Sequence, residues 1–174
     1  MTHLVRKLTS VSSDDIARLF EDCKTKILEG TLPFDGTPTE ADAAVYFNIG
    51  IPNVLALPQG EVFGYFKDDH LCFIRYALVT DGVLEQSYYL AGNDAEGSRA
   101  YLYSQEFADA LKAYYQANFT SVDSWAIAGQ STATYEENVL KPNLYETAGV
   151  SYVKEDLTDP ATDITYEKRT ATFS

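Results

Sequence analysis

The residues most often used for nucleophilic or metal chemistry are few in this sequence and poorly placed for it. The two histidines, His3 and His70, lie in the amino-terminal segment and in a short polar turn, so a histidine-based catalytic triad lacks a credible base. Asp68-Asp69-His70 brings metal-capable atoms together, but a solvated turn explains these residues more simply. The sequence has no glycine-rich loop of the nucleotide-hydrolase type. We therefore expect no metal site.

The charge of the chain limits the partners it can have. Thirteen lysines and arginines stand against 26 aspartates and glutamates, which gives a formal net charge of −13. At long range this charge repels phosphate backbones and anionic lipid, so we expect neither nucleic acid nor a membrane as partner. The charge attracts cations such as an amine substrate or a basic peptide or protein. It also suits a protein that imitates nucleic acid, or it serves solubility alone.

Length and composition indicate one domain. With 174 residues, of which 45% are hydrophobic, the chain can bury a well-formed core, and we expect a single domain over residues 1–174. No apolar run approaches the roughly 20 residues that span a bilayer, and residues 1–8 lack the apolar core of a secretory signal. We therefore expect a cytoplasmic protein. Cys23 and Cys72 fall inside apolar patterns, which predicts reduced core cysteines.

The first 30 residues predict a short strand at 4–8 and then an amphipathic helix. The side chains at 12–15, Ser-Ser-Asp-Asp, can cap this helix and place negative charge in its first turn. Apolar residues follow at three- and four-residue spacing until Gly30 ends the pattern. This apolar stripe consists of Ile16, Leu19, Phe20, Cys23 and Ile27.

The next segment combines a loop with a second, shorter helix. Prolines and a glycine make residues 31–38 a loop. Residues 39–47 have helical spacing. We expect this helix to end before Gly50 and Pro52, because glycine and proline commonly break helices.

From residue 61 the apolar period changes from helical to alternating, which predicts an antiparallel meander. Strands at 61–66 and 71–79 flank a polar turn, and Asp81-Gly82 marks another tight turn before a strand at 83–90. Tyr101-Leu102-Tyr103 suits an extended segment or the approach to a helix. The remaining predicted elements are a helix at 104–118, a strand at 122–128, a helix at 134–148 and strands at 150–155 and 164–173.

One stretch near the carboxyl terminus has a more specific pattern. Residues 137–150 read Glu-Asn-Val-Leu-Lys-Pro-Asn-Leu-Tyr-Glu-Thr-Ala-Gly-Val. Leu140 and Leu144 share one helix face, and Gly149 can take the left-handed conformation that stops a helix. β-prone residues follow the glycine. The segment therefore predicts an amphipathic helix, a glycine turn and a strand.

This pattern resembles the last helix of the Gcn5-related N-acetyltransferases, the GNAT superfamily. Lys141 stands where that family usually has Ala, and Val150 where it usually has Phe. The matching positions are Asn138, Leu144, Tyr145, Glu146 and Gly149.

The order of the predicted elements is also similar to that of the whole acetyltransferase domain. The resemblance implies an α/β (α+β) fold with a mixed, mostly antiparallel sheet of six to seven strands flanked by about four helices. It further implies that the strands at 83–90 and 122–128 are parallel neighbours that separate at one end. In the family, the gap between them admits the pantetheine arm of the cofactor.

The resemblance implies acetyl-coenzyme A (acetyl-CoA) as cofactor, with its pyrophosphate held by backbone N–H groups at the start of the helix after the fourth strand. The corresponding loop is residues 93–100, where Gly97 fills the first glycine position of the family pattern and Ser98 follows it. Asp94 stands where the family has Arg or Gln, and Arg99 where it has a small residue. The loop is therefore degenerate: it brings negative charge beside the expected phosphates, while Arg99 can contact a phosphate directly.

Three further positions have roles that the resemblance implies. The tyrosine matching Tyr145 often lies near the thioester sulfur and can protonate the leaving thiolate, a role that suits a phenol whose pKa exceeds that of the thiol. The alternative for Tyr145 is packing between the last helix and the sheet. Asn138 binds the pantetheine arm or faces water. Glu85, early in the fourth strand, is the candidate general base, with a solvated strand end as the alternative.

Two hypotheses of function follow from these observations. The first is an N-acetyltransferase that transfers acetyl from acetyl-CoA to an amine of a small molecule or a peptide. The second is a catalytically inactive, acidic protein of the same fold that acts as a binding or structural component, for example of a virus or an assembled particle. The degenerate loop separates the two hypotheses, because only the first requires bound cofactor.

Overall fold

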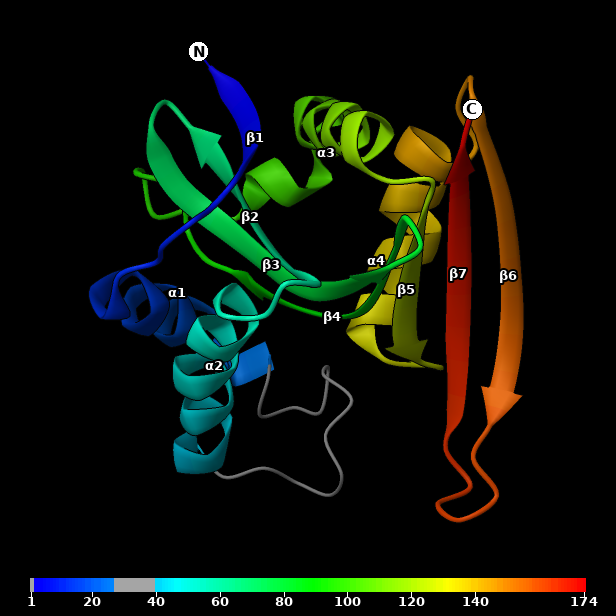
Figure 1. The fold of residues 1–174 in the computed structure, drawn as a ribbon, viewed down its shortest axis with the longest axis horizontal. Helices are drawn as coiled ribbons and strands as arrows, with labels where there is room; N and C mark the ends of the chain where they lie inside the picture. Colours follow the sequence, from blue (N-terminus) through cyan, green and yellow to red (C-terminus); the bar gives the residue numbers. More distant parts are fainter. Residues whose placement is uncertain (1, 27–39) are drawn as a thin grey trace.

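Within residues 2–26 and 40–174, which the computed structural model describes, seven strands form one mixed sheet (Figure 1). The strand order is β1-β2-β3-β4-β5-β7-β6, and every neighbouring pair is antiparallel except β4 and β5. This confirms the predicted mixed, mostly antiparallel sheet. The strands are β1 (His3–Lys7), β2 (Gly60–Lys67), β3 (His70–Thr80), β4 (Val83–Ala91), β5 (Ser121–Ile127), β6 (Val150–Thr158) and β7 (Thr165–Phe173).

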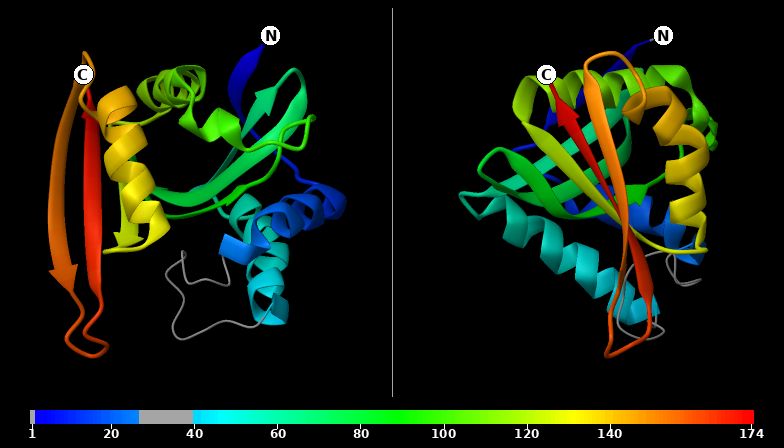
Figure 2. Two further views of the ribbon diagram at one scale, coloured as in Figure 1. Left: turned by 180° about the vertical axis from the view of Figure 1, so that it is seen from behind. Right: turned by 90° about the vertical axis from the view of Figure 1, so that its right-hand side faces the viewer.

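Helices cover both faces of this sheet (Figure 2). On one face, α1 (Ser13–Lys26) and α2 (Glu40–Leu55) pack over β2, β3 and β4. On the other face lie α3 (Gln105–Asn118) and the continuous pair formed by α4 (Ser131–Tyr135) and η3 (Glu136–Tyr145). None of the described helices is long and apolar enough to cross a membrane.

The alternation of strand side chains divides the core into two clusters. Val62 of β2 packs in the cluster with α1 and α2, whereas the next residue, Phe63, packs in the cluster with α3. Successive strand residues point to opposite faces, so β2 contributes to both clusters. Cys23 and Cys72 are both buried free thiols, one in each cluster, as the apolar patterns predict.

The start of α1 agrees with the sequence. The Asp15 N–H donates to the Ser12 hydroxyl at 3.1 Å, which is the capping contact expected from the polar residues there. Asp14 and Asp15 lie in the first turn, where negative charge is favourable. The predicted end of this helix at Gly30 and the loop at 31–38 lie outside the described residues.

The second helix is longer than predicted, because α2 runs through Gly50 and Pro52 to Leu55. Phe47 and Ile51 are fully buried against β2 and β3, so the apolar face continues across the expected break. A proline inside a helix removes one backbone hydrogen bond and strains the preceding turn. Burial of the apolar face outweighs that local cost.

The last helix also differs from its predicted bounds of 134–148, because it begins at Ser131 and ends at Tyr145. Its second part, η3, is a π-helix that contains Pro142. The wider turn accommodates a residue that has no N–H to donate. Gly149 has the expected positive φ of 80°, but it lies in the turn before β6 and does not end the helix.

The segment before α3 is the short 3₁₀ helix η2 (Ala100–Tyr103) and not an extended stretch. The Tyr101 hydroxyl lies 2.9 Å from the Cys72 carbonyl oxygen and 2.8 Å from that of Gly92, and its one proton is shared between these two acceptors. These two bonds require the ring to point back at the ends of β3 and β4. They explain why the chain turns tightly here.

The parallel pair β4 and β5 is the feature that creates the site. Only Val83 with Ser121 and Leu84 with Val122 are paired, and beyond them the two strands diverge (Figure 1). The prediction that these strands are parallel neighbours that separate at one end is therefore confirmed. The sheet consists of two halves, β1 to β4 and β5-β7-β6, joined along a two-residue ladder.

We predict that Gly92→Ala destabilises the protein by about 1–3 kcal/mol, a usual cost of overpacking. A Cβ at Gly92 would meet Leu19 Cδ2 at 2.3 Å and the Cys72 carbonyl oxygen at 3.3 Å, because α1 packs directly on the end of β4. Urea denaturation measures the change. Ala95→Ser in the exposed turn is the control and is expected to stay within about 0.5 kcal/mol of the parent. Equal stability of Gly92→Ala and the parent would mean that α1 can move away from β4 freely.

Candidate active site

A cavity of about 210 Å³ occupies the gap where β4 and β5 diverge. It extends through the sheet, because Tyr89 and Ser124 line it from the α3 side, whereas their neighbours Tyr88 and Trp125 point to the opposite face. Most of the wall is aromatic and aliphatic. Its polar members are Arg75, Arg99, Ser124, Ser131, Thr132 and Glu136, together with the tyrosine hydroxyls.

The buried guanidinium of Arg75 crosses this gap. Arg75 lies on β3, and its Nη2 donates to the Asp123 carbonyl of β5 at 2.9 Å, while Nη1 donates to the Tyr115 hydroxyl of α3 at 2.7 Å. Ser124 Oγ lies 3.4 Å from the same Nη2. Arg75 therefore links the two halves of the sheet at the point where their backbones no longer pair.

A buried carboxyl group, that of Glu136, lies beside the same network. The Tyr145 hydroxyl donates to Glu136 Oε2 at 2.5 Å, and Ser124 Oγ lies 3.5 Å from that hydroxyl. Burial raises the pKa of Glu136 above that of a free carboxyl group, and the bond from Tyr145 and the nearby charges of Arg75 and Arg169 oppose this rise. Burial, and then the charge of Glu136, raise the pKa of Tyr145 well above its ordinary value. Tyr145 is consequently a protonated donor at neutral pH.

The three positions given roles by the resemblance lie at different distances from the cavity. Tyr145 is only 3% exposed, stacks on Tyr152 with ring centroids 5.3 Å apart, and reaches the cavity wall through Glu136 and Ser124. Asn138 is exposed on η3, and Glu85 is half-buried on β4 opposite Leu78. None of the three is among the described residues that line the cavity, and the roles of Tyr145, Asn138 and Glu85 remain predictions.

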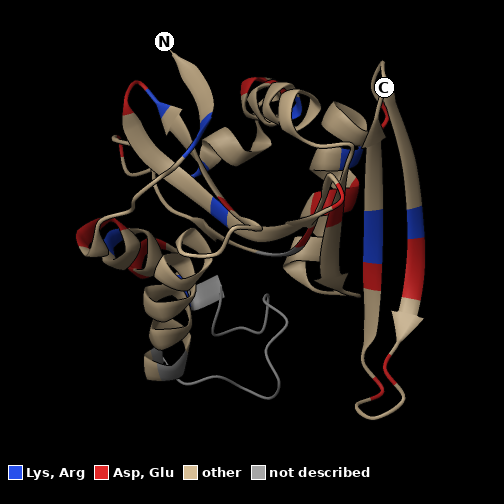
Figure 3. Ribbon diagram, viewed as in Figure 1, with Lys and Arg blue, Asp and Glu red and all other residues tan. Residues whose placement is uncertain are grey.

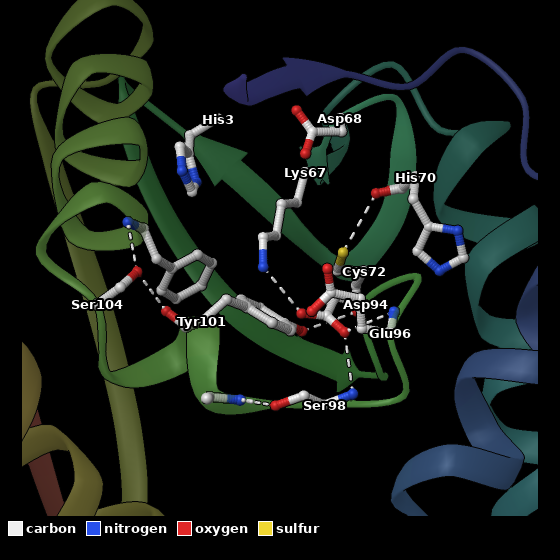
Figure 4. Close-up of polar contacts among 12 residues, drawn as sticks. His3, Lys67, Asp68, His70, Cys72, Asp94, Glu96, Ser98, Tyr101 and Ser104 are labelled. Atoms are coloured by element: carbon white, nitrogen blue, oxygen red, sulfur yellow. Dashed lines mark hydrogen bonds and ion pairs between the residues drawn. The ribbon is translucent and has the colours of Figure 1, made fainter. Parts of the chain in front are cut away.

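The loop that follows β4 is closed on itself by the carboxylate of Asp94 (Figure 4). Asp94 Oδ1 accepts from the backbone N–H groups of Glu96 and Ser98 at 3.0 and 2.9 Å. Its Oδ2 accepts from the Lys67 ammonium at 3.0 Å. These partners, the Ser98 N–H first and Lys67 next, hold the pKa of Asp94 below its usual range. The carboxylate is 7% exposed and ionised at neutral pH.

Of the three candidate cofactor residues in this loop, only one faces the cavity. Gly97 sits at the tip with a φ of 79° and open space where a side chain would begin, and Ser98 uses its N–H on Asp94. Arg99 alone faces the cavity, where its Nη1 donates to the Ala91 carbonyl at 3.2 Å. The loop does not open α3 directly, because η2 intervenes and Ser104 caps that helix.

Sequence reasoning missed the polar residues at the centre of the site. Arg75 carries a visible signal, since a charge inside the apolar run of a central strand requires a buried partner. Glu136 and Ser124 carry none, because both types are common on surfaces. Only the packing of η3 against β5 brings them to the cavity.

Several solved acetyltransferases share this arrangement of elements. AAC(6′)-Ib in complex with ribostamycin and coenzyme A matches with a TM-score of 0.61 and 15% identity, covering 99% of this chain and 94% of that one. An acetyltransferase from Salmonella typhimurium that modifies the N-terminal serine of ribosomal protein L7/L12 matches with a TM-score of 0.60 and 10% identity, over 99% and 95%. A GNAT-family acetyltransferase from Streptococcus pneumoniae matches with a TM-score of 0.53 and 11% identity, over 99% and 100%.

The chain therefore has the GNAT fold, as its carboxy-terminal pattern and element order imply. No family model matches the sequence, and no curated protein matches it either. At identities of 10–15%, the likeness extends to the fold alone.

We predict that Asp94→Asn lowers stability near neutral pH and that the difference from the parent disappears in acid. The pKa of Asp94 is lower in the folded protein than its ordinary value of 3.8, so the ionised form stabilises the fold fully above that pH and is lost as pH falls through the folded value. Urea denaturation at pH 7 and at about pH 2.5 tests this. Glu96→Gln, in the same turn but exposed, is the control and should show little difference at pH 7. A difference for Asp94→Asn that persists in acid would contradict the ionic contribution.

Proposed function

We propose that this chain is an N-acetyltransferase that transfers an acetyl group from acetyl-CoA to an amine. The observation that carries the proposal is the open cavity between the diverging parallel strands β4 and β5, with a buried carboxyl group and hydroxyl groups at its wall. The fold shared with solved acetyltransferases supports it.

The residues at the wall have chemistry that suits such a transfer. Acetyl-CoA would supply the acetyl group as a thioester. The Ser124 hydroxyl lines the cavity 3.5 Å from the Tyr145 hydroxyl, which stays protonated well above neutral pH. Ser124 can therefore give its proton to a leaving thiolate as Tyr145 turns its own proton from Glu136 to Ser124, and the proton lost by the acceptor amine replaces it. Glu136 keeps Tyr145 oriented. Arg99 supplies a positive charge on the same wall.

The acceptor is proposed to be a cationic small-molecule amine or a basic peptide. The net charge of −13 favours the approach of such molecules and opposes nucleic acid. Two of the matched structures concern an aminoglycoside ligand and a ribosomal protein substrate, which are compatible with amine acceptors in this fold. A cytoplasmic location remains part of this proposal.

A second candidate is a catalytically inactive, acidic protein of the same fold. The Asp94 contacts favour it, because the N–H groups expected to hold pyrophosphate already bind a carboxylate of the chain. This loop, as folded, does not fit the phosphate end of acetyl-CoA. The cavity supports a donor arm between β4 and β5, whereas the loop does not support the phosphate end, so the two ends of the site favour different candidates.

Calorimetric titration with acetyl-CoA decides between the two candidates. The first predicts saturable binding together with a change in fluorescence of Trp125, the single tryptophan of the chain, which lies in the cavity wall. If neither heat nor a fluorescence change is detected up to millimolar acetyl-CoA, the acetyltransferase proposal is rejected.

If the enzyme binds acetyl-CoA, Tyr145→Phe should lower kcat on the order of 100-fold while leaving acetyl-CoA affinity nearly unchanged, because the lost hydroxyl acts on the leaving group. Steady-state kinetics with a cationic amine and calorimetry measure the two quantities. Tyr152→Phe is the matched control: its ring stacks on Tyr145, and its buried hydroxyl has no hydrogen-bond partner among the described residues. Parent-like turnover of Tyr145→Phe would remove this residue from the mechanism.

A further inference from the structure

The loop between β4 and η2 already contains an anion in the place where a donor phosphate is expected. Two backbone N–H groups, from Glu96 and Ser98, converge on one carboxylate oxygen of Asp94. Converging backbone N–H groups of a turn form a nest that suits one anionic oxygen. Here the oxygen comes from the chain itself, and Figure 4 shows the side chain folded back into its own loop.

Three further N–H groups of the loop are also in use, those of Asn93, Asp94 and Gly97. The Asn93 N–H donates to Asp22 Oδ2 of α1 at 3.0 Å, so a second carboxylate occupies the other side of the turn. The Gly97 N–H donates to the Asp94 carbonyl at 3.0 Å, and the Asp94 N–H donates to the Ser98 carbonyl at 2.8 Å. An incoming phosphate would have to break these contacts.

The ammonium group of Lys67 is likewise already paired with the Asp94 carboxylate. Lys67 Nζ lies 3.0 Å from Asp94 Oδ2, with the lysine side chain 19% exposed and the aspartate side chain 5% exposed. Figure 3 shows acidic segments (red) on helices, strands and turns alike, in keeping with the net charge of −13. The two charges of this pair cancel, so Lys67 adds no net positive charge that would attract a pyrophosphate.

We propose that Asp94 determines the donor specificity of this chain by filling the phosphate nest, so that the acyl donor is recognised through its thioester arm and not through its pyrophosphate. This inference rests on the proposed acetyltransferase function. The donors it assigns are acyl thioesters in general, including acyl-pantetheine, which has the arm of coenzyme A but no phosphate.

The test compares acetyl-CoA with acetyl-pantetheine on the full chain, by calorimetry and Trp125 fluorescence. For the parent protein we expect dissociation constants within about threefold of each other, since filled donors add nothing to phosphate binding. A parent protein that binds acetyl-CoA more than about tenfold more tightly than acetyl-pantetheine would overturn the proposal.

Three variants distinguish an effect of the occupied N–H groups from an effect of negative charge alone. Asp94→Ala empties the nest and frees Lys67, so its preference for acetyl-CoA over acetyl-pantetheine should rise to about tenfold or more. Asp94→Asn removes the charge but keeps an oxygen that can accept from the same N–H groups, and Glu96→Gln removes a neighbouring exposed charge. Both should keep the parent's small preference. An equal rise in all three variants would mean that charge alone acts, which would also overturn the proposal.

Inorganic pyrophosphate tests the nest without reference to catalysis. We expect millimolar pyrophosphate to bind Asp94→Ala and not the parent, followed by NMR shifts of the Glu96 and Ser98 amides. If neither thioester binds the parent, the proposed function fails, and the pyrophosphate result still decides whether Asp94 fills the nest. Equal binding of pyrophosphate to parent and Asp94→Ala, or binding to neither, would reject the role of Asp94.

Discussion

Beyond Leu84 and Val122, β4 and β5 have no ladder in the described part of the chain, and the guanidinium of Arg75 takes over the connection. It reaches from β3 to a carbonyl of β5 and to the Tyr115 hydroxyl of α3. A buried charge left without partners costs about 3–5 kcal/mol, so the network that surrounds this group keeps the two halves of the sheet in one arrangement. Where the backbone ladder ends, a few side chains bridge the two strands, and the space between those side chains is the cavity.

The same constraint explains why the polar residues of the cavity come from so many elements. Arg75 on β3, Ser124 on β5 and the helix residues Glu136 and Tyr145 meet only where the strands separate. The π-helix η3 begins at Glu136 and ends at Tyr145. An added residue per turn changes which side chains face the sheet, so the local helix geometry sets the positions of both groups.

Two buried acidic residues have opposite effects on the space around them: one borders an open cavity, and the other fills the hydrogen-bond donors of a loop. Glu136 lies at the cavity wall with a hydroxyl donor and leaves the cavity open. Asp94 consumes the donors of its own loop and an ammonium group, which closes the other end of the expected donor site. A GNAT fold with an open cavity between β4 and β5 and a filled N–H nest is what the proposal of a donor held mainly by its pantetheine arm requires.

The sequence alone determined the features that depend on local pattern. Alternating and helical periods placed the strands and the main helices, the polar residues before Ile16 capped α1, and element order with the motif around Tyr145 identified the fold. These succeed because periodicity and capping act between residues close in the chain.

Only the tertiary structure decided the extent of α2 through Pro52, the wide turns of η3 and the contents of the site. In α2, burial of Ile51 outweighs a proline signal that is local. The partners of Asp94 include Lys67, distant in sequence, and its own loop N–H groups, whose direction no residue type reveals. A sequence shows that a carboxylate stands where the family has Arg or Gln, but the direction of the loop decides whether that carboxylate repels a phosphate or takes its place.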